Sequence, residues 1–187
     1  RPLIIADITS TLDEERFKIS PENLNEFVNI GRQKYGVSND PQFGSFDKKR
    51  NSDAVFGRID WQINNSNLLT IRNNFTSDIN KLGLQDNKPI TLYESYGNDK
   101  NIDNSFLATL RTSVSSNITN ELKLQHLYTY QNSSPGDQLP GQNIPSAIVE
   151  NIVSRVGTND LRTTAQLGGH RFAQESFKNN VFQLVNN

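Results

Sequence analysis

Two stretches of this chain alternate apolar and polar side chains almost residue by residue, each on both sides of a short polar turn. The first runs from about residue 54 to 78 and turns at NNSN, and the second runs from about 105 to 131 and turns at SSNITN. Successive side chains of a strand point to opposite faces, so this period predicts two β-hairpins, each with one apolar and one polar face. The apolar face has to lie against a protein core or against lipid.

The connections between the expected strands are short and long in turn. The two hairpin turns are tight, whereas residues 79–104 and 132–178 are long polar connections, and a further strand is expected from about residue 179. The second connection contains one candidate strand, AIVENIVSRV. Long loops are uncommon in compact domains, and soluble β-sandwiches have turns about every 8–12 residues. Outer-membrane barrels have short turns at one end and long loops at the other, with strands of about 9–11 residues.

The sequence therefore predicts a mainly β protein, an antiparallel transmembrane β-barrel segment with long extracellular loops and one short helix. We expect residues 1–53 to be an extracellular loop region, with the helix at about 20–36, and residues 54–187 to hold the barrel strands. Ser20 suits the N-cap of this helix, Pro21 its first position and Gly36 its C-terminal cap.

Aromatic residues of the apolar parity fall at two levels when the tight turns are placed on the periplasmic side. Trp61 comes near the lower membrane edge, and four aromatic residues come near the upper edge. Amphipathic rings favour both membrane interfaces. We therefore predict that the membrane-interface aromatics are Trp61, Phe75, Phe106, Tyr128 and Tyr130.

The polar parity of the same strands carries charges of both signs. In a soluble sheet these side chains would form a solvated outer face, and in a large barrel they would line a water-filled lumen. The predicted lumen-lining residues are Arg58, Asp60, Arg72, Arg111, Glu121 and Lys123. Asn73 and His126 fall on the apolar parity, where a polar group is costly in hydrocarbon, and a β-bulge would be one way to re-aim either side chain.

The expected strands are too few to close a barrel, because the smallest closed outer-membrane barrels have about eight. An open sheet in lipid would leave backbone groups unpaired. We therefore expect an incomplete segment of a larger barrel. The chain also lacks methionine and begins at Arg1, which is expected of an internal piece of a longer protein.

Composition excludes several other classes. The chain has no cysteine, so it can form neither a disulfide framework nor a thiolate metal site. A net charge of −1 provides no bulk attraction for nucleic acid. His126 and His170 are far apart in sequence and have no carboxylate at metal-ligand spacing. No catalytic grouping can be named, so we expect neither an enzyme nor a bound cofactor or metal.

Four runs of the sequence resemble the TonB-dependent outer-membrane transporters, and in particular their Oar-like branch. The runs are KRNSDAVFGRIDWQINNSNLLTIRNNF at 49–75, ITLYESY at 90–96, TNELKLQ at 119–125 and QLGGHRF at 166–172. The resemblance implies a 22-stranded barrel closed by an N-terminal plug and driven by the inner-membrane TonB complex. The expected partners are outer-membrane lipid, the rest of the barrel with its plug, the TonB complex through segments that this sequence does not contain, and a surface lipoprotein.

The resemblance implies a location in the outer membrane of a Gram-negative bacterium, with the loops extracellular. Its members capture an extracellular ligand and import it through the polar lumen, and the ligand here would be a peptide, a glycan or a chelate. Tyr93, Tyr96 and Phe172 are candidates for stacking on that ligand, and the more ordinary role for such residues is to pack loop against loop. The alternative is a secreted or surface-anchored β-sandwich adhesin or glycan-binding module, which would fold without detergent.

Overall fold

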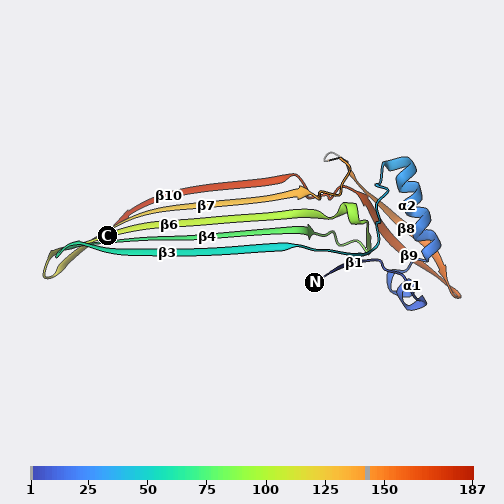
Figure 1. Ribbon diagram of the computed structural model, residues 1–187, viewed down its shortest axis with the longest axis horizontal. Helices are drawn as coiled ribbons and strands as arrows, with labels where there is room; N and C mark the ends of the chain where they lie inside the picture. The colour runs from blue at the N-terminus through green and yellow to red at the C-terminus, as the bar shows by residue number, and fades with distance from the viewer. Residues whose placement is uncertain (1, 142–143) are drawn as a thin grey trace. The chain divides into compact units, whose positions relative to one another are not determined.

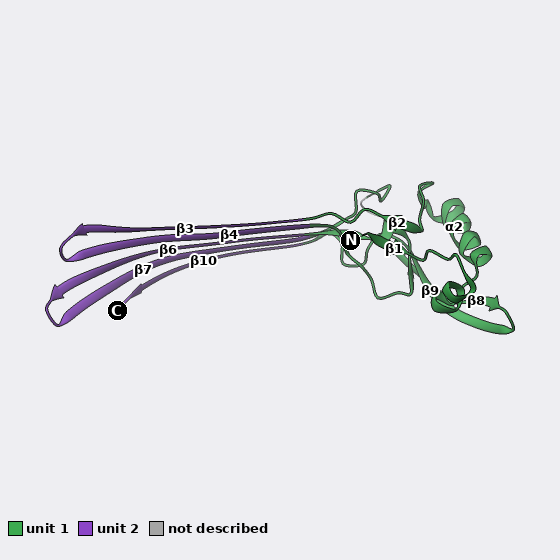
Figure 2. Ribbon diagram, turned by 60° about the horizontal axis from the view of Figure 1, so that its bottom comes forward, with its two compact units in different colours: residues 1–50, 80–99, 133–175 green, residues 51–79, 100–132, 176–187 purple. Residues whose placement is uncertain are grey.

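The computed structural model describes residues 2–141 and 144–187 of the chain. The fold is mainly β, with 60% of the residues in strands and 14% in helices, and its sheets are largely antiparallel. The chain forms two compact units, which Figure 2 colours separately. Unit 1 contains residues 1–50, 80–99 and 133–175, and unit 2 contains residues 51–79, 100–132 and 176–187.

Five long strands form an antiparallel sheet in the order β10-β7-β6-β4-β3, and Figure 1 shows them side by side. Their bounds are β3 (Arg50–Asn64), β4 (Asn67–Leu84), β6 (Gly97–Ser115), β7 (Ile118–Pro135) and β10 (Glu175–Asn186). The two predicted hairpins are confirmed, since β3 and β4 and likewise β6 and β7 follow each other through tight turns. Unit 2 consists of the parts of these strands that lie within its residue ranges.

The strands are longer than the alternation of side chains predicted. Three of them have 18 or 19 residues rather than about ten, so much of 79–104 and the ends of 132–178 are strand, not loop. These added residues are rich in Asn, Asp and Lys, which suggested loops. Strand pairing is made by backbone groups, however, and it continues wherever both faces can accept polar side chains.

Unit 1 contains two small sheets. In the first, β9 (Asn159–Gly168) lies between β8 (Ser146–Val156), which is antiparallel to it, and β5 (Ile90–Thr91), which is parallel to it. The second pairs β1 (Leu3–Ile5) with β2 (Gly44–Phe46), and a short 3₁₀ helix, η1, covers Tyr93–Ser95. The candidate strand AIVENIVSRV is confirmed as β8. The long connection 132–178 was not predicted to contain β9, which forms a third hairpin with β8.

The predicted helix is confirmed as α2 (Pro21–Tyr35). The Ser20 hydroxyl accepts a hydrogen bond from the Asn23 backbone N–H at 3.3 Å, and Gly36 closes the helix in the left-handed conformation at φ 73°. Its buried face contributes Leu24, Phe27 and Val28 to the core of unit 1.

A second helix, α1 (Thr11–Phe17), was not predicted, so the expectation of one helix is wrong for the described residues. It is short and buries no residue, so it has no apolar stripe to reveal it. The sequence feature that indicates this helix is its N-terminal cap. The Asp13 backbone N–H donates to the Ser10 hydroxyl at 3.3 Å, and the Ser10 hydroxyl donates to the Asp13 carboxylate at 2.7 Å.

All the buried residues of the described chain belong to unit 1. Their centre includes Ile19, Ile90, Leu92 and Ala165, which have no exposed surface, packed with the buried face of α2. Within the described part of unit 2, by contrast, no residue is buried. Unit 1 is therefore stabilised by a core of its own, and unit 2 is a sheet without one.

We predict that Leu92→Ala destabilises unit 1 by about 2–5 kcal/mol, because the side chain is fully buried and its loss leaves a cavity. Leu12→Ala, on the exposed side of α1, is the matched control and should change stability by less than about 0.5 kcal/mol. Native-state hydrogen exchange of the β9 amides measures both changes. Equal losses of protection in the two variants would contradict the assignment of the core.

Candidate functional site

The five-stranded sheet has one charged face, and the structure brings the six predicted lumen-lining residues together on it. Arg58 Nε lies 2.8 Å from Asp60 Oδ2, and Asp60 in turn accepts a hydrogen bond of 2.6 Å from the Thr70 hydroxyl on β4. On β6 and β7, Glu121 pairs with Arg111 at 3.2 Å and with Lys123 at 2.5 Å. The Arg58–Asp60 pair is exposed and contributes little stability, whereas the side chain of Glu121 is only 22% exposed.

A hollow of about 350 Å³ lies on this charged face. Five of the six predicted residues line it, namely Arg58, Arg72, Arg111, Glu121 and Lys123, and Thr70 joins them. Four of the six predicted residues are basic and two are acidic. Asp78, which accepts a hydrogen bond from Ser52 at 2.8 Å, and Asp103, which accepts one from Thr129 at 2.8 Å, lie on the same face, so its basic and acidic residues within unit 2 are equal in number. The Arg111–Glu121 pair joins two neighbouring strands.

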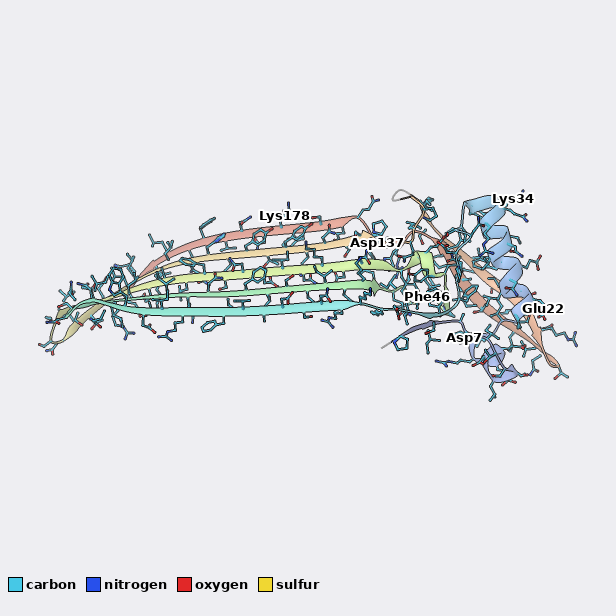
Figure 3. The ribbon with its side chains drawn as sticks, viewed as in Figure 1. Asp7, Glu22, Lys34, Phe46, Asp137 and Lys178 are labelled. Carbon is cyan, nitrogen blue, oxygen red and sulfur yellow. The ribbon has the colours of Figure 1, made fainter. Side chains whose placement is uncertain are left out.

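The opposite face of the sheet is apolar and uncovered. Ile59 is 66% exposed and Phe182 is 74% exposed, and Val55, Trp61 and Leu184 are similarly open. Exposed apolar patches on soluble monomers are usually small. Figure 3 shows side chains standing off this sheet, and no other element of unit 2 packs over them among the residues described.

Cross-strand contacts fix which residues of the sheet lie opposite each other. The Ser113 N–H donates to the Ser66 carbonyl at 2.8 Å, and Glu121 and Asn187 exchange two backbone hydrogen bonds of 3.0 Å. The side-chain contacts Asp60–Thr70 and Arg111–Glu121 fix the two hairpins. Counting away from these contacts gives one cross-strand row on the apolar face, which contains Gly57, Asn73, Phe106, His126 and Phe182.

This row contains the two polar residues that fitted the apolar face poorly. The His126 ring stacks on the Phe182 ring with centroids 4.3 Å apart, and its Nε2 lies 3.5 Å from Asn180 Oδ1. Asn73 lies between Gly57 and Phe106 in the same row. This row lies midway between the rows of Trp61 and Tyr130, so both polar residues stay in the middle of the apolar face. Stacking on Phe182 accounts for His126, and nothing in the structure explains Asn73.

The predicted interface aromatics share the apolar face. Trp61 lies near the β3–β4 turn, while Phe75, Phe106, Tyr128 and Tyr130 lie farther from the turns. Two lysines make cation–π contacts with the Tyr130 ring. Lys178 Nζ lies 5.4 Å from the ring centroid and Lys100 Nζ lies 5.9 Å from it (Lys178 is labelled in Figure 3).

The three predicted ligand-stacking residues lie in unit 1 and differ in their surroundings. Tyr93 stacks on Phe46 at 3.9 Å with the rings nearly parallel, and Tyr96 is only 3% exposed, so both rings are packed inside the unit. Phe172 is 54% exposed, beside His170 and under the Arg171 guanidinium at 4.6 Å. Of these three residues, Phe172 alone offers a ligand an open aromatic ring.

The GGHRF element forms the predicted tight turn directly after β9. Gly168 has φ 78°, and a Cβ there would lie 2.2 Å from the Pro145 carbonyl oxygen, so only glycine fits. Burial lowers the pKa of His170, whose Nδ1 accepts the Phe172 N–H at 3.2 Å. Arg171 pairs with the buried Asp86 at 3.0 Å. These contacts make the element a structural turn.

Unit 1 also contains a buried carboxyl that the sequence did not reveal. Glu94 lies in η1, and its Oε2 accepts the Ser38 backbone N–H at 2.9 Å. Burial raises the pKa of Glu94, and this effect outweighs the hydrogen bonds and the attraction of Arg32 that lower it. No group of three or more side chains suited to a metal ion occurs among the described residues.

None of the described helices is long and apolar enough to cross a membrane. No model of a known protein family, no curated protein and no solved structure matches the chain.

We predict that Glu94→Gln makes unit 1 less dependent on pH. The folded pKa of Glu94 is raised above its ordinary value of 4.5, so its stabilising contribution is complete below that value and is lost as pH rises through the folded pKa. Gln keeps an acceptor for Ser38 but cannot ionise. The stability of the variant relative to the native chain should therefore increase from pH 4 to pH 7, as measured by urea unfolding.

Glu26→Gln, on the exposed side of α2, is the control for this measurement. It should leave the pH dependence of unfolding as it is in the native chain. A parallel change in both variants would mean that the burial of Glu94 does not govern the effect.

Proposed function

We propose that this chain is part of a TonB-dependent outer-membrane transporter, in which unit 2 is a segment of the barrel wall and unit 1 belongs to the extracellular side. The observation that carries the proposal is the five-stranded sheet, which has long strands and no buried residue in unit 2. One face holds most of its charges and the other most of its large apolar side chains, with Phe56, Phe177 and Val181 as exposed apolar residues on the charged face. Both faces would be stabilised if lipid lay against the apolar face and water lay against the charged face.

The spacing of the aromatic residues supports this orientation. Counting along the ladders puts the rows of Trp61 and Tyr130 about eight residues apart, or ~27 Å at ~3.4 Å per residue. A strand tilt of about 40° reduces this to ~21 Å along the membrane normal, close to the apolar band of about 25 Å between aromatic girdles. The lysines on Tyr130 would then lie at headgroup level, where cationic side chains reach water.

The edges of the sheet support a larger barrel. β3 and β10 are edge strands in the described part of the chain, and each presents a row of backbone groups to a neighbour. Such groups cost several kcal/mol each if they are left unpaired in lipid. Further strands of the same barrel would pair with them.

In this proposal the ligand is captured on the extracellular side and moves through the lumen along the charged face. The basic residues Arg58, Arg72, Arg111 and Lys123 are balanced on that face by the acidic residues Asp60, Asp78, Asp103 and Glu121. Mixed charges keep the passage hydrated, and the energy for opening would come from the TonB complex acting on a plug.

A β-sandwich adhesin is the competing proposal. A sandwich needs a second sheet packed about 10 Å from the apolar face, with side chains of both sheets interdigitating. Ile59, Phe182 and their neighbours are open to solvent instead, so no second sheet covers them in the described residues. This observation favours the transporter.

We predict that neighbouring residues of β4 meet different solvents. Single cysteines at Ile71 and Arg72 lie on opposite faces, and the chain has no native cysteine to interfere. A nitroxide label at Ile71→Cys should collide mainly with oxygen dissolved in lipid, and a label at Arg72→Cys mainly with a water-soluble nickel chelate. Labels that both meet only the aqueous reagent would rule out the barrel wall.

We also predict the direction in which the segment crosses the membrane. On intact cells, an impermeant thiol reagent should label Lys34→Cys, at the exposed end of α2, and should not label Asn65→Cys in the β3–β4 turn. Disrupting the outer membrane should expose Asn65→Cys to the reagent. The opposite labelling pattern would reverse the orientation.

A further inference from the structure

Unit 1 contains a groove of about 780 Å³ whose walls come from distant parts of the chain. The lining includes β1, the end of α1, the segment before β3, and residues between β4 and η1. All of these residues belong to unit 1. The volume lies within the range of small-molecule sites, about 300–1,000 Å³.

The charged side chains that line this groove all have the same sign. They are Arg16, Lys48, Arg50 and Lys88, and no Asp or Glu lines the groove among the residues that the structure describes. The chain as a whole has 20 acidic and 19 basic residues, so its composition does not account for such a bias. A concave site lined by cations raises the local concentration of anions.

An unpartnered buried hydroxyl gives an independent indication of a ligand. Thr91 lines the groove, is 3% exposed, and its Oγ1 makes no hydrogen bond in the described structure. The buried Asn80 Oδ1, in the same lining, is likewise without a partner. Buried polar atoms are nearly always hydrogen-bonded, and a buried one that lacks a partner costs about 1–3 kcal/mol. A ligand in the groove would supply the missing partners.

The groove also has apolar walls. Phe17 lines it, with the Arg16 guanidinium 5.4 Å from the ring centroid, and Leu3 and Pro89 are nearby in the lining. Tyr96 also belongs to the lining, although its side chain is almost fully buried. The site therefore combines cations, neutral polar atoms and an aromatic surface.

We propose that this groove binds an acidic saccharide. Its carboxylate or sulfate groups would face Arg16, Lys48 and Lys88, its hydroxyl groups would pair with Thr91 Oγ1 and Asn80 Oδ1, and the apolar face of a sugar ring would lie against Phe17. The inference deepens the proposed function by naming a class of ligand for the extracellular side. Binding itself needs only unit 1.

The test is calorimetric titration of the chain in detergent with an oligogalacturonate, and with maltotetraose as the uncharged comparison. The oligogalacturonate should bind, and maltotetraose should bind at least about tenfold more weakly. Raising the salt concentration from 50 to 500 mM should weaken binding of the oligogalacturonate by about tenfold or more. Equal binding of the two sugars, or no binding of the acidic one, would overturn the proposal.

Variants connect the binding to the groove. Lys48→Gln combined with Lys88→Gln should weaken oligogalacturonate binding by about tenfold or more, and Thr91→Val, which keeps the side-chain volume, should weaken it several-fold. Lys34→Gln, at the exposed end of α2 and outside the lining, is the matched control and should leave binding unchanged. Hydrogen exchange of β9 shows that each variant is folded. Unchanged binding in folded groove variants would contradict the assignment.

The result is separable from that of the nitroxide experiment on β4. Lipid contact at Ile71 without binding of the acidic sugar would refute the proposed ligand of the groove and leave the barrel-wall proposal intact. Sugar binding without lipid contact at Ile71 would support the proposed ligand of the groove and refute the barrel-wall proposal.

Discussion

Among the described residues of unit 2, the apolar side chains of the five-stranded sheet have no protein core to pack against, and the stability of the sheet depends on what covers them. Residues such as Ile59 and Phe182 are open on one face, while the opposite face holds the charge pairs around Asp60 and Glu121. A sheet of this kind is stable only between two different solvents or beneath another layer of protein. Its backbone ladder supplies the geometry, but its environment has to supply the hydrophobic stabilisation.

Unit 1 follows the opposite logic. Its core around Ile90, Leu92 and the buried face of α2 lies inside the unit, with a capped helix and short strands around it. Because the core is internal, its surface is available for recognition, and its groove is assembled from several segments that the core holds in place. Unit 1 is therefore stabilised by its own core, whereas the stability of unit 2 depends on what surrounds it.

The hairpins and their two faces could be predicted because a strand has a period of two, and that period is visible in the residues themselves. The helix α2 could be predicted because Ser20, Pro21 and Gly36 act locally. The strand extensions were missed because backbone pairing continues through polar residues. Tyr96 shows a different limit, since nothing in its neighbours along the chain indicates that tertiary packing buries it.

The charged face was predicted residue by residue, because parity alone decides the face. The groove could not be predicted in this way. Arg16, Lys48 and Lys88 come from separate segments, and each is unremarkable among its neighbours in sequence. Their common sign becomes visible only when the fold brings them to one wall. Chemistry that depends on assembled distant residues is therefore accessible only from the structure.

The interleaving of the two units along the chain has a consequence for the order of folding. Unit 1 is built from three separate stretches, 1–50, 80–99 and 133–175, with a hairpin of the long sheet between each pair. Its core pairs β5 with β9, which are far apart in sequence, so the contact order is high and closure of long loops precedes the stabilising contacts. A ribosome must therefore complete both hairpins before the last stretch of unit 1 exists, and no single continuous excision of the gene could transplant unit 1 alone.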